Sequence, residues 1–365
     1  MPRLNPSLFW RAHHISPHAA RLLPACRTLP SALTELRWIR EHVEVEQSYG
    51  SNIPPKIRLW QLCERRGKGI PLQYVLGTQP FGDLEIKCRP GVLIPRPETE
   101  AYTQHLAQIL LNPPPTPNDS ARPFSIVDFC TGTGCIPLQF LSQLSPDYPN
   151  LRITGVDISP HAVRLARENL RHNLSLLMLP PEIYSPHLPP PEASDRDVRA
   201  SVQFTQGDIF SDSTIQNLQT QNPGGGGWDV LISNPPYISR DGFAKDTARS
   251  VRNYEPLSAL VPPSQYKIDG VLDEDVFYAR LLEVAEQLNP KRVLLEVASM
   301  EQAIRVVELL IRNDGLVERY KTVEVWRDDP RQHQNGQETV KVGNRAVVVR
   351  GSGQGRSVYL CQHDN

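Results

Sequence analysis

The spacing of apolar residues divides the chain into regions of different character. Apolar residues at helical spacing predict a short helical region over residues 31–70, with helices at 31–43 and 57–65. Short apolar runs separated by glycine turns then predict a β-hairpin and linker segment over 71–123, with strands at 74–76, 84–86 and 92–94.

From residue 124 the pattern becomes an alternation of strands and helices, which continues to residue 352. The predicted strands are 124–128, 152–157, 202–208, 228–233 and 292–297, with two more near 317–326 and 345–349. The predicted helices are 135–144, 162–173, 276–288 and 301–312. Ser159 and Pro160 supply an N-cap and a first helical residue. Repeated strand–helix units predict an α/β fold, a parallel sheet with helices on both faces, followed by a tail over 353–365.

Proline is abundant, with 35 residues, and it clusters between the predicted elements. The proline- or glycine-rich stretches 112–123, 179–194 and 222–227 are therefore expected to be surface insertions without a catalytic role.

The N-terminal segment has a composition of its own. Residues 1–34 carry four arginines and no acidic residue, with serines and apolar residues at intervals. This composition predicts a mitochondrial transit peptide over 1–30 and a location in the mitochondrial matrix. Five prolines argue against a long amphipathic helix there, and a disordered tail on a cytoplasmic protein is the alternative.

The net charge, the apolar runs and the spacing of cysteines and histidines indicate which classes of partner to expect: nucleic acid, membrane or metal ion. The formal charge is −1, and without the four arginines of the leader the rest of the chain stands at −5. Such a balance gives no polycationic surface for nucleic acid, so we expect no direct nucleic-acid partner. No apolar run is long enough to span a bilayer. The protein is expected to be a monomer. The six cysteines and ten histidines show no metal-ligand spacing.

A rigid turn, Asn234-Pro235-Pro236-Tyr237, directly follows the predicted strand 228–233. Proline fixes φ and has no N–H, while its carbonyl stays able to accept. An asparagine oxygen beside such a carbonyl offers two acceptors, which suits a planar –NH2 group with two N–H bonds. The turn therefore suggests alkylation of an amide or amino nitrogen, although Pro-Pro also simply ends strands.

A glycine-rich loop, Thr131-Gly132-Thr133-Gly134, follows the first strand and opens a helix. Small residues there let backbone N–H groups approach a ligand closely. Asp157 ends the second strand and is placed to accept both hydroxyls of a ribose, and Asp208 ends the third, within reach of an adenine amino group. Because Pro137 occupies the place of the last glycine of a dinucleotide motif, S-adenosyl-L-methionine fits better than a dinucleotide.

These motifs together resemble the PrmC/HemK family of release-factor glutamine methyltransferases, and the resemblance covers about residues 65–350. Its segments are Arg65/Arg66 with Pro71-Leu-Gln-Tyr-Val-Leu-Gly77 and Phe81, Val92-Leu-Ile-Pro-Arg-Pro-Glu-Thr-Glu100, Asp128-Phe-Cys-Thr-Gly-Thr-Gly134, Asn234-Pro-Pro-Tyr237, Tyr254-Glu-Pro256 with Ala259-Leu260, and Leu295-Glu-Val297 with Gln302. The segment at 92–100 is one that generic methyltransferases lack.

The resemblance implies a class I, Rossmann-like methyltransferase sheet and N5-methylation of the glutamine in the Gly-Gly-Gln motif of class 1 peptide-chain release factors. It implies that Asn234 and Pro235 receive the amide hydrogens and that Tyr237 packs near the substrate. Residues 131–134, Asp157, Asp208 and Asn234 would hold the cofactor. Cys130 stands where the family more often has glycine, so it is expected to line the pocket.

Three other functions compete with this reading. Adenine-N6 nucleic-acid methyltransferases use the same Asn-Pro-Pro-Tyr because an exocyclic amino group presents the same two hydrogens, but they must flip a base. Another protein side-chain methyltransferase, or an inactive interaction subunit with this fold, are the remaining alternatives.

Overall fold

The computed structural model describes residues 4–112, 123–148, 150–176, 178–179, 183–187, 200–221, 227–332 and 338–362. The predicted insertions lie largely outside these residues. The chain forms two compact units. One comprises Met1–Thr78, Cys88–Pro90 and Thr247–Glu255, and the other comprises Gln79–Lys87, Gly91–Asp246 and Pro256–Asn365.

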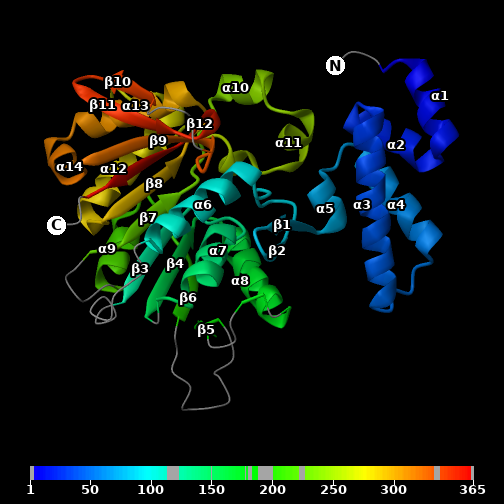
Figure 1. The fold of residues 1–365 in the computed structure, drawn as a ribbon, viewed down its shortest axis with the longest axis horizontal. Helices are drawn as coiled ribbons and strands as arrows, with labels where there is room; N and C mark the ends of the chain where they lie inside the picture. Colours follow the sequence, from blue (N-terminus) through cyan, green and yellow to red (C-terminus); the bar gives the residue numbers. More distant parts are fainter. Residues whose placement is uncertain are drawn as a thin grey trace, which may run out of the picture. The chain divides into compact units, whose positions relative to one another are not determined.

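The first unit is helical (Figure 1). Its helices are α1 (Pro6–Ile15), α2 (Pro17–Cys26), α3 (Leu29–Ser48), α4 (Pro55–Gly67), α5 (Leu72–Leu76) and α11 (Arg249–Tyr254). The apolar faces of α1 to α5 meet in one cluster that contains Leu22, Leu36, Ile39 and Leu62, all buried. The predicted helices at 31–43 and 57–65 are confirmed as parts of α3 and α4.

Helical structure begins much earlier than the predicted residue 31. Asn5 and Ser16 cap α1 and α2 with their side-chain oxygens, and Pro6 and Pro17 each stand at a first helical position. Proline is tolerated there because that N–H has no intrahelical partner. The prolines therefore start short helices rather than preventing them, and Leu22 and Leu23 are fully buried in the bundle. The transit peptide stays a prediction.

The second unit is an α/β domain, which confirms the predicted fold class. Its strands are β1 (Thr78–Phe81), β2 (Leu84–Lys87), β3 (Phe124–Phe129), β4 (Leu151–Asp157), β5 (Ile183–Tyr184), β6 (Ala200–Gln206), β7 (Val230–Ser233), β8 (Arg292–Glu296), β9 (Thr322–Asp329), β10 (Glu338–Val342), β11 (Arg345–Arg350) and β12 (Ser352–Cys361). Within the described residues, β1 and β2 form a hairpin and the others form one sheet in the order β10-β11-β9-β12-β8-β7-β3-β4-β6-β5. Strands β6, β4, β3, β7 and β8 run parallel, whereas β12 is antiparallel to both β8 and β9.

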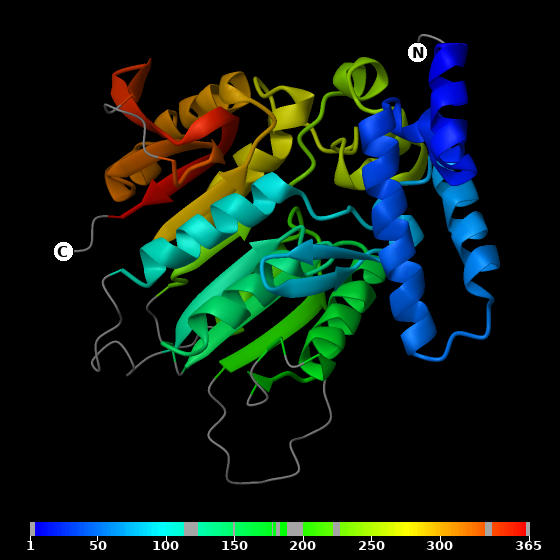
Figure 2. The same ribbon diagram turned by 45° about the vertical axis from the view of Figure 1, so that its right-hand side comes forward.

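Helices cover both faces of this sheet. The helices of this unit are α6 (Pro97–Leu110), α7 (Cys135–Leu144), α8 (Pro160–Ser175), α9 (Asp212–Gln221), α10 (Arg240–Lys245), α12 (Val276–Leu288), α13 (Met300–Ile311) and α14 (Asp314–Arg319), with 3-10 turns at Leu257–Ala259 and Asp273–Asp275. Figure 2 shows α6, α7 and α8, in cyan to green, on one face together with the β1–β2 hairpin. Their side chains share a core with Ile126 of β3, whereas α9, α12, α13 and α14 share the opposite core with Val127.

Several predicted elements differ from the structure. Residues 74–76 belong to helix α5, which ends at Gly77 with φ 88°. Residues 92–94 form no regular strand, because the prolines around them cannot donate to a ladder. Residues 353–361, predicted as a tail, form most of β12 in the middle of the sheet. The run predicted as a strand at 317–326 divides between α14 and β9.

Other boundaries are confirmed. The predicted helices 135–144 and 276–288 coincide with α7 and α12. Ser159 caps α8 by accepting from the Ala162 N–H. No helix among the described residues has the length and apolar character needed to cross a membrane.

Candidate functional site

The site lies where the order of strands reverses. The chain runs from β3 outward through β4 to β6 and then returns to the other side of β3 as β7. In open parallel sheets, ligands bind beyond the carboxyl ends of the strands at such a switch point. The glycine loop follows β3, Asp157 ends β4, Asp208 follows β6 and Asn234 follows β7, so the fold brings all the predicted motifs to this edge.

A pocket opens at this edge, and most of the predicted residues line it. Its wall includes Thr131, Gly132, Thr133, Asp157, Asp208, Asn234 and Pro236. Gly134, Pro235 and Tyr237 are not part of the wall. The segment 91–96 forms another part of the wall, and so does Cys130, as predicted.

Asp157 fastens the glycine loop to the end of β4. Its Oδ2 accepts the N–H of Gly132 at 2.8 Å, and its Oδ1 accepts the N–H of Ser159 at 2.9 Å. Burial raises the pKa of Asp157, and the two backbone hydrogen bonds act in the opposite direction. The carboxylate is therefore held in one orientation at the pocket wall.

Asp208 lies beside an aromatic stack. Its Oδ1 accepts the N–H of Phe210 at 2.9 Å, and its Oδ2 accepts the hydroxyl of Tyr266 at 2.8 Å. The rings of Phe210 and Tyr266 stack with centroids 3.9 Å apart. Tyr266 and Phe277 both line the pocket, so the Asp208 end of the pocket has apolar, aromatic walls.

Gly134 acts behind the loop rather than in the pocket. Its φ is 78°, and a Cβ at this position would lie 2.9 Å from the Cβ of Ala166 and 3.0 Å from the ring of Phe204. A larger residue would push α7 away from α8 and β6. Gly134 therefore permits close packing, which is the part that a third glycine plays in nucleotide-binding loops.

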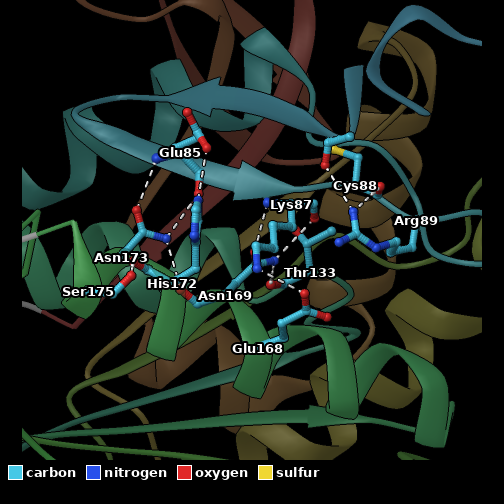
Figure 3. A network of polar contacts seen from close by, with 11 residues as sticks. Glu85, Lys87, Cys88, Arg89, Thr133, Glu168, Asn169, His172, Asn173 and Ser175 are labelled. Carbon is cyan, nitrogen blue, oxygen red and sulfur yellow. Dashed lines mark hydrogen bonds and ion pairs between the residues drawn. The ribbon is translucent and has the colours of Figure 1, made fainter. Parts of the chain in front are cut away.

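Asn169 ties the same loop to the hairpin (Figure 3). Its Nδ2 donates to the Thr133 carbonyl at 3.0 Å, and its Oδ1 accepts the N–H of Lys87 at 2.7 Å. One turn later on α8, Asn173 accepts the N–H of Glu85 and donates to its carbonyl, both at 3.0 Å. The side chain of Asn169 is fully buried. Two asparagines four residues apart thus pair with the backbone of β2, and only Asn169 reaches the glycine loop.

Asn234 belongs to a chain of polar groups that ends at Glu296. Its Nδ2 donates to Thr99 Oγ1 at 3.4 Å, and the Thr99 hydroxyl donates to Glu296 Oε2 at 2.6 Å. The other carboxylate oxygen, Oε1, accepts the hydroxyl of Tyr237 at 2.9 Å. Burial raises the pKa of Glu296, and hydrogen bonds from Thr99 and Tyr237 act against this shift.

The backbone of the turn is also anchored. Gln302 of α13 donates from Nε2 to the Tyr237 carbonyl at 3.2 Å, and Tyr278 of α12 donates to the Glu296 carbonyl at 2.7 Å. Gln302 and Tyr278 are both buried. Two helices on one face of the sheet therefore fix the Asn-Pro-Pro-Tyr turn and the end of β8.

Comparison with known proteins identifies the family. Over 352 residues, the chain is 30% identical to the mitochondrial MRF1 N(5)-glutamine methyltransferase MTQ1 of Saccharomyces cerevisiae, covering 95% of this chain and 90% of that protein. The chain belongs to the release factor glutamine methyltransferase family. It is also 30% identical to the probable MRF1 mitochondrial N(5)-glutamine methyltransferase of Schizosaccharomyces pombe, over 72% of this chain and 73% of that protein. A release factor glutamine methyltransferase of Thermodesulfovibrio yellowstonii gives the same identity over 73% and 75%.

Other comparisons add little to this assignment. No family model matches the chain. Among solved structures, the N-terminal domain of human METTL16 in complex with SAH gives a TM-score of 0.41 at 13% identity, over 86% of this chain and 85% of that one. The human methyltransferase 10 domain containing protein gives 0.42 at 12% identity, over 91% and 98%.

The cofactor of this glutamine methyltransferase is S-adenosylmethionine, and the pocket fits it. The open backbone at Gly132, with φ 55° and only van der Waals neighbours near the position of a Cβ, leaves room for a ligand against the loop. Asp157 supplies carboxylate oxygens suited to ribose hydroxyls, and the aromatic end near Asp208 suits a purine ring. No phosphate-binding helix start with a full glycine fingerprint is present in 131–137, consistent with a ligand that lacks pyrophosphate.

Cys130 stands at a position where glycine was expected, and its backbone conformation is one that glycine adopts more easily. It has φ 60°, a left-handed conformation that side chains with a Cβ adopt at a cost. Burial, followed by the nearby carboxylates of Asp157 and Asp128, raises the pKa of its thiol well above the ordinary value, which favours the protonated form.

Sequence reasoning missed several residues that shape the site. Thr99, Glu296 and Asn169 act through hydrogen bonds to partners 36 to 197 positions away along the chain. No spacing rule detects such partners, and only the presence of Thr99 and Glu296 in the family-like segments 92–100 and 295–297 drew any notice to them. Tyr266 lies in a stretch with no predicted element, so nothing in the pattern marked it.

Proposed function

We propose that this enzyme methylates N5 of the glutamine in the Gly-Gly-Gln motif of a class 1 peptide-chain release factor in the mitochondrial matrix. Family membership supports a glutamine acceptor, and two yeast relatives whose names place them in mitochondria support the compartment. The arginine-bearing, acid-free N-terminal segment supports the same compartment. A cytoplasmic location is the alternative.

One observation carries the assignment of the acceptor. In the part of the chain that the structure describes, neither Asn234 Oδ1 nor the Pro235 carbonyl accepts a hydrogen bond. Both belong to the turn that borders the pocket. A primary amide has two N–H bonds, and it needs two acceptors at one end when it leaves water. The turn offers this pair.

The two acceptors address the main chemical difficulty. An amide nitrogen is a poor nucleophile because its lone pair is delocalised into the carbonyl. S-adenosylmethionine, when bound, supplies a methyl group on a positively charged sulfur. Asn234 and Pro235 hold the nitrogen in one orientation and stabilise the positive charge that develops on it during substitution. Such positioning supplies up to ~7–11 kcal/mol in ideal cases.

Proton transfer needs no dedicated base in this proposal. The nitrogen that gains the methyl group becomes strongly acidic until it releases one proton, and water accepts that proton readily. Pro236 borders the pocket and Tyr237 is fixed by Glu296, so both shape the space around the acceptor rather than exchange protons with it. Burial, and next the Glu296 carboxylate, raise the pKa of Tyr237 well above its usual value, which keeps the phenol protonated.

The test uses the purified chain with labelled S-adenosylmethionine and, separately, a mitochondrial release factor, a cytosolic release factor and DNA. Mass spectrometry then maps the methyl group. Label on the Gly-Gly-Gln glutamine of the mitochondrial factor, lost when that glutamine is replaced by alanine, is the expected result. Label confined to the cytosolic factor would overturn the compartment, and label only on DNA would overturn the protein substrate.

A further inference from the structure

The geometry points to Thr99 and Glu296 as positioning residues that fix which atom of the Asn234 amide faces the substrate. This inference rests on the proposed function, because it concerns the acceptor for the glutamine amide. An asparagine side chain has an oxygen and a nitrogen of nearly equal size, and a half-turn about its last bond exchanges them. The exchange replaces an acceptor by a donor, which repels an incoming –NH2 group.

Glu296 sets the direction of the hydrogen bonds. A carboxylate can only accept, and both of its oxygens are in use, Oε1 by the Tyr237 hydroxyl at 2.9 Å and Oε2 by the Thr99 hydroxyl at 2.6 Å. Thr99 has a single hydroxyl hydrogen, and Glu296 takes it. What remains on Thr99 Oγ1 is lone-pair density, so this oxygen accepts from its other neighbour.

That neighbour is Asn234. Its amide lies 3.4 Å from Thr99 Oγ1, and only the nitrogen can donate across this distance. With Nδ2 directed to Thr99, Oδ1 is left as the acceptor for substrate. The carboxylate thus controls, through one hydroxyl, the polarity of a group that it does not touch.

Burial makes this control strict. Glu296 is 1% exposed and Thr99 is 2% exposed, so water does not offer either group a competing partner. The three side chains come from separate elements, Thr99 from the first turn of α6, Asn234 from the turn after β7 and Glu296 from the end of β8. An unsatisfied hydroxyl or carboxylate at this depth is costly, which holds the arrangement in one state.

Substitutions that change polarity but not shape test the inference. In Glu296→Gln, the oxygen keeps its bond from Tyr237 and the new NH2 group faces Thr99. Thr99 then accepts, its hydrogen turns to Asn234, and the asparagine presents Nδ2 to substrate. We expect kcat on the release factor to fall by about 10²-fold, as for loss of one transition-state contact, with S-adenosylhomocysteine affinity unchanged.

Two substitutions of Thr99 provide a matched pair of variants, and one of them combined with Glu296→Gln completes a double-mutant cycle. Thr99→Val removes the hydroxyl and lowers kcat by about tenfold, whereas Thr99→Ser retains kcat within about threefold. In the double variant Thr99→Val with Glu296→Gln, the reversed polarity is no longer transmitted. Its kcat therefore equals that of Thr99→Val rather than the product of the two losses.

The outcomes separate this inference from the proposed function. If the wild-type enzyme labels no release-factor glutamine, the proposed function fails and the inference fails with it. If wild type is active but Thr99→Val and Glu296→Gln keep its kcat, then Glu296 does not orient Asn234 through Thr99. The same conclusion follows if the loss of kcat in the double variant is the product of the two single losses. Loss of S-adenosylhomocysteine affinity in parallel with kcat also overturns it. Should Glu296→Gln not fold, the Thr99→Val and Thr99→Ser pair decides.

Discussion

The carboxylate of Asp157 accepts the backbone N–H of Gly132 at 2.8 Å, so one acidic side chain both shapes the glycine loop and lines the pocket that we assign to the cofactor. Because burial raises the pKa of this carboxyl above its ordinary value of 3.8, protonation begins at a higher pH than for an exposed aspartate.

Cofactor binding should therefore weaken in acid. The charged form accepts hydroxyls on both oxygens, and it is lost as pH falls through the raised pKa, by up to about tenfold in affinity per pH unit. Titration calorimetry with S-adenosylhomocysteine from pH 8 to pH 5 measures the effect. Asp157→Asn is expected to bind weakly and with no pH dependence from this source. If the affinity of Asp157→Asn for S-adenosylhomocysteine falls with pH as it does in wild type, another group causes the pH dependence.

Asn234→Ala should separate transfer from binding. The variant loses one of the two acceptors for the amide, and kcat is expected to fall by about 10²–10³-fold. Its affinity for S-adenosylhomocysteine should stay within about threefold, because the loop and Asp157 remain. Asp157→Ala provides the contrast, with affinity lost first. Equal methylation of a release factor by Asn234→Ala and wild type would contradict the role given to the turn.

The two buried asparagines of α8 make a matched pair. Asn169→Ala leaves the Lys87 N–H and the Thr133 carbonyl without this partner, and Asn173→Ala does the same to the backbone of Glu85. Each should lower the free energy of unfolding by about 1–3 kcal/mol. Only Asn169→Ala should also weaken S-adenosylhomocysteine binding, since only Asn169 holds the glycine loop. Equal affinities in the two variants would show that the loop keeps its shape without Asn169.

Cys130 should prefer glycine to alanine. Both replacements remove the sulfur, but alanine retains the strain of a Cβ at φ 60°, so Cys130→Gly should be more stable than Cys130→Ala by about 1 kcal/mol. Cys135, at the start of α7, serves as the control, because there alanine should be the more stable of the two. Denaturant unfolding of the four variants measures both differences, and the same sign at both positions would count against the strain.

The N-terminal helices should matter to the helical unit. Leu22→Ala is expected to lower its free energy of unfolding by about 2–5 kcal/mol, because Leu22 is 0% exposed. Trp10→Ala is the control, since Trp10 is 76% exposed and its loss should change stability by less than about 0.5 kcal/mol. Hydrogen exchange in α3 reports the effect. Equal protection in both variants would show that α2 is dispensable and would favour its removal as a leader.

Local patterns predicted the regular parts of the fold well. Helix α12 carries apolar residues at a 3.6-residue period, and helix α7 follows directly on the glycine loop, so the bounds of both were predictable. Pro6 and Pro17 were misleading, because the same residue breaks a helix inside and starts one at its first position. Strand β12 was missed since Gly353 and Gly355 interrupt its first half, and its pairing depends on two strands far away.

The candidate site divides in a similar way. Groups at the end of a strand or directly after it, such as Asp157 and Asn234, were predictable because parallel strands bring their carboxyl ends to one edge. Glu296 and Asn169 were not, because their function depends on which buried partners tertiary packing gives them. The spacing of residues along the sequence does not show which of them become neighbours in the folded protein.

The placement of β12 has a consequence for the order of assembly. Ser357 of β12 pairs with Glu296 at the end of β8, although the strands that form the glycine loop, Asp157 and Asp208 all precede β8 in the chain. During synthesis the N-terminal parts of a chain emerge and fold first, so β12 becomes available for pairing only after all of these strands have been made. A nascent chain can therefore complete its cofactor pocket while the strand beneath Glu296 still has an open edge. During synthesis, the chain is therefore expected to become able to bind S-adenosylmethionine before it becomes able to transfer the methyl group.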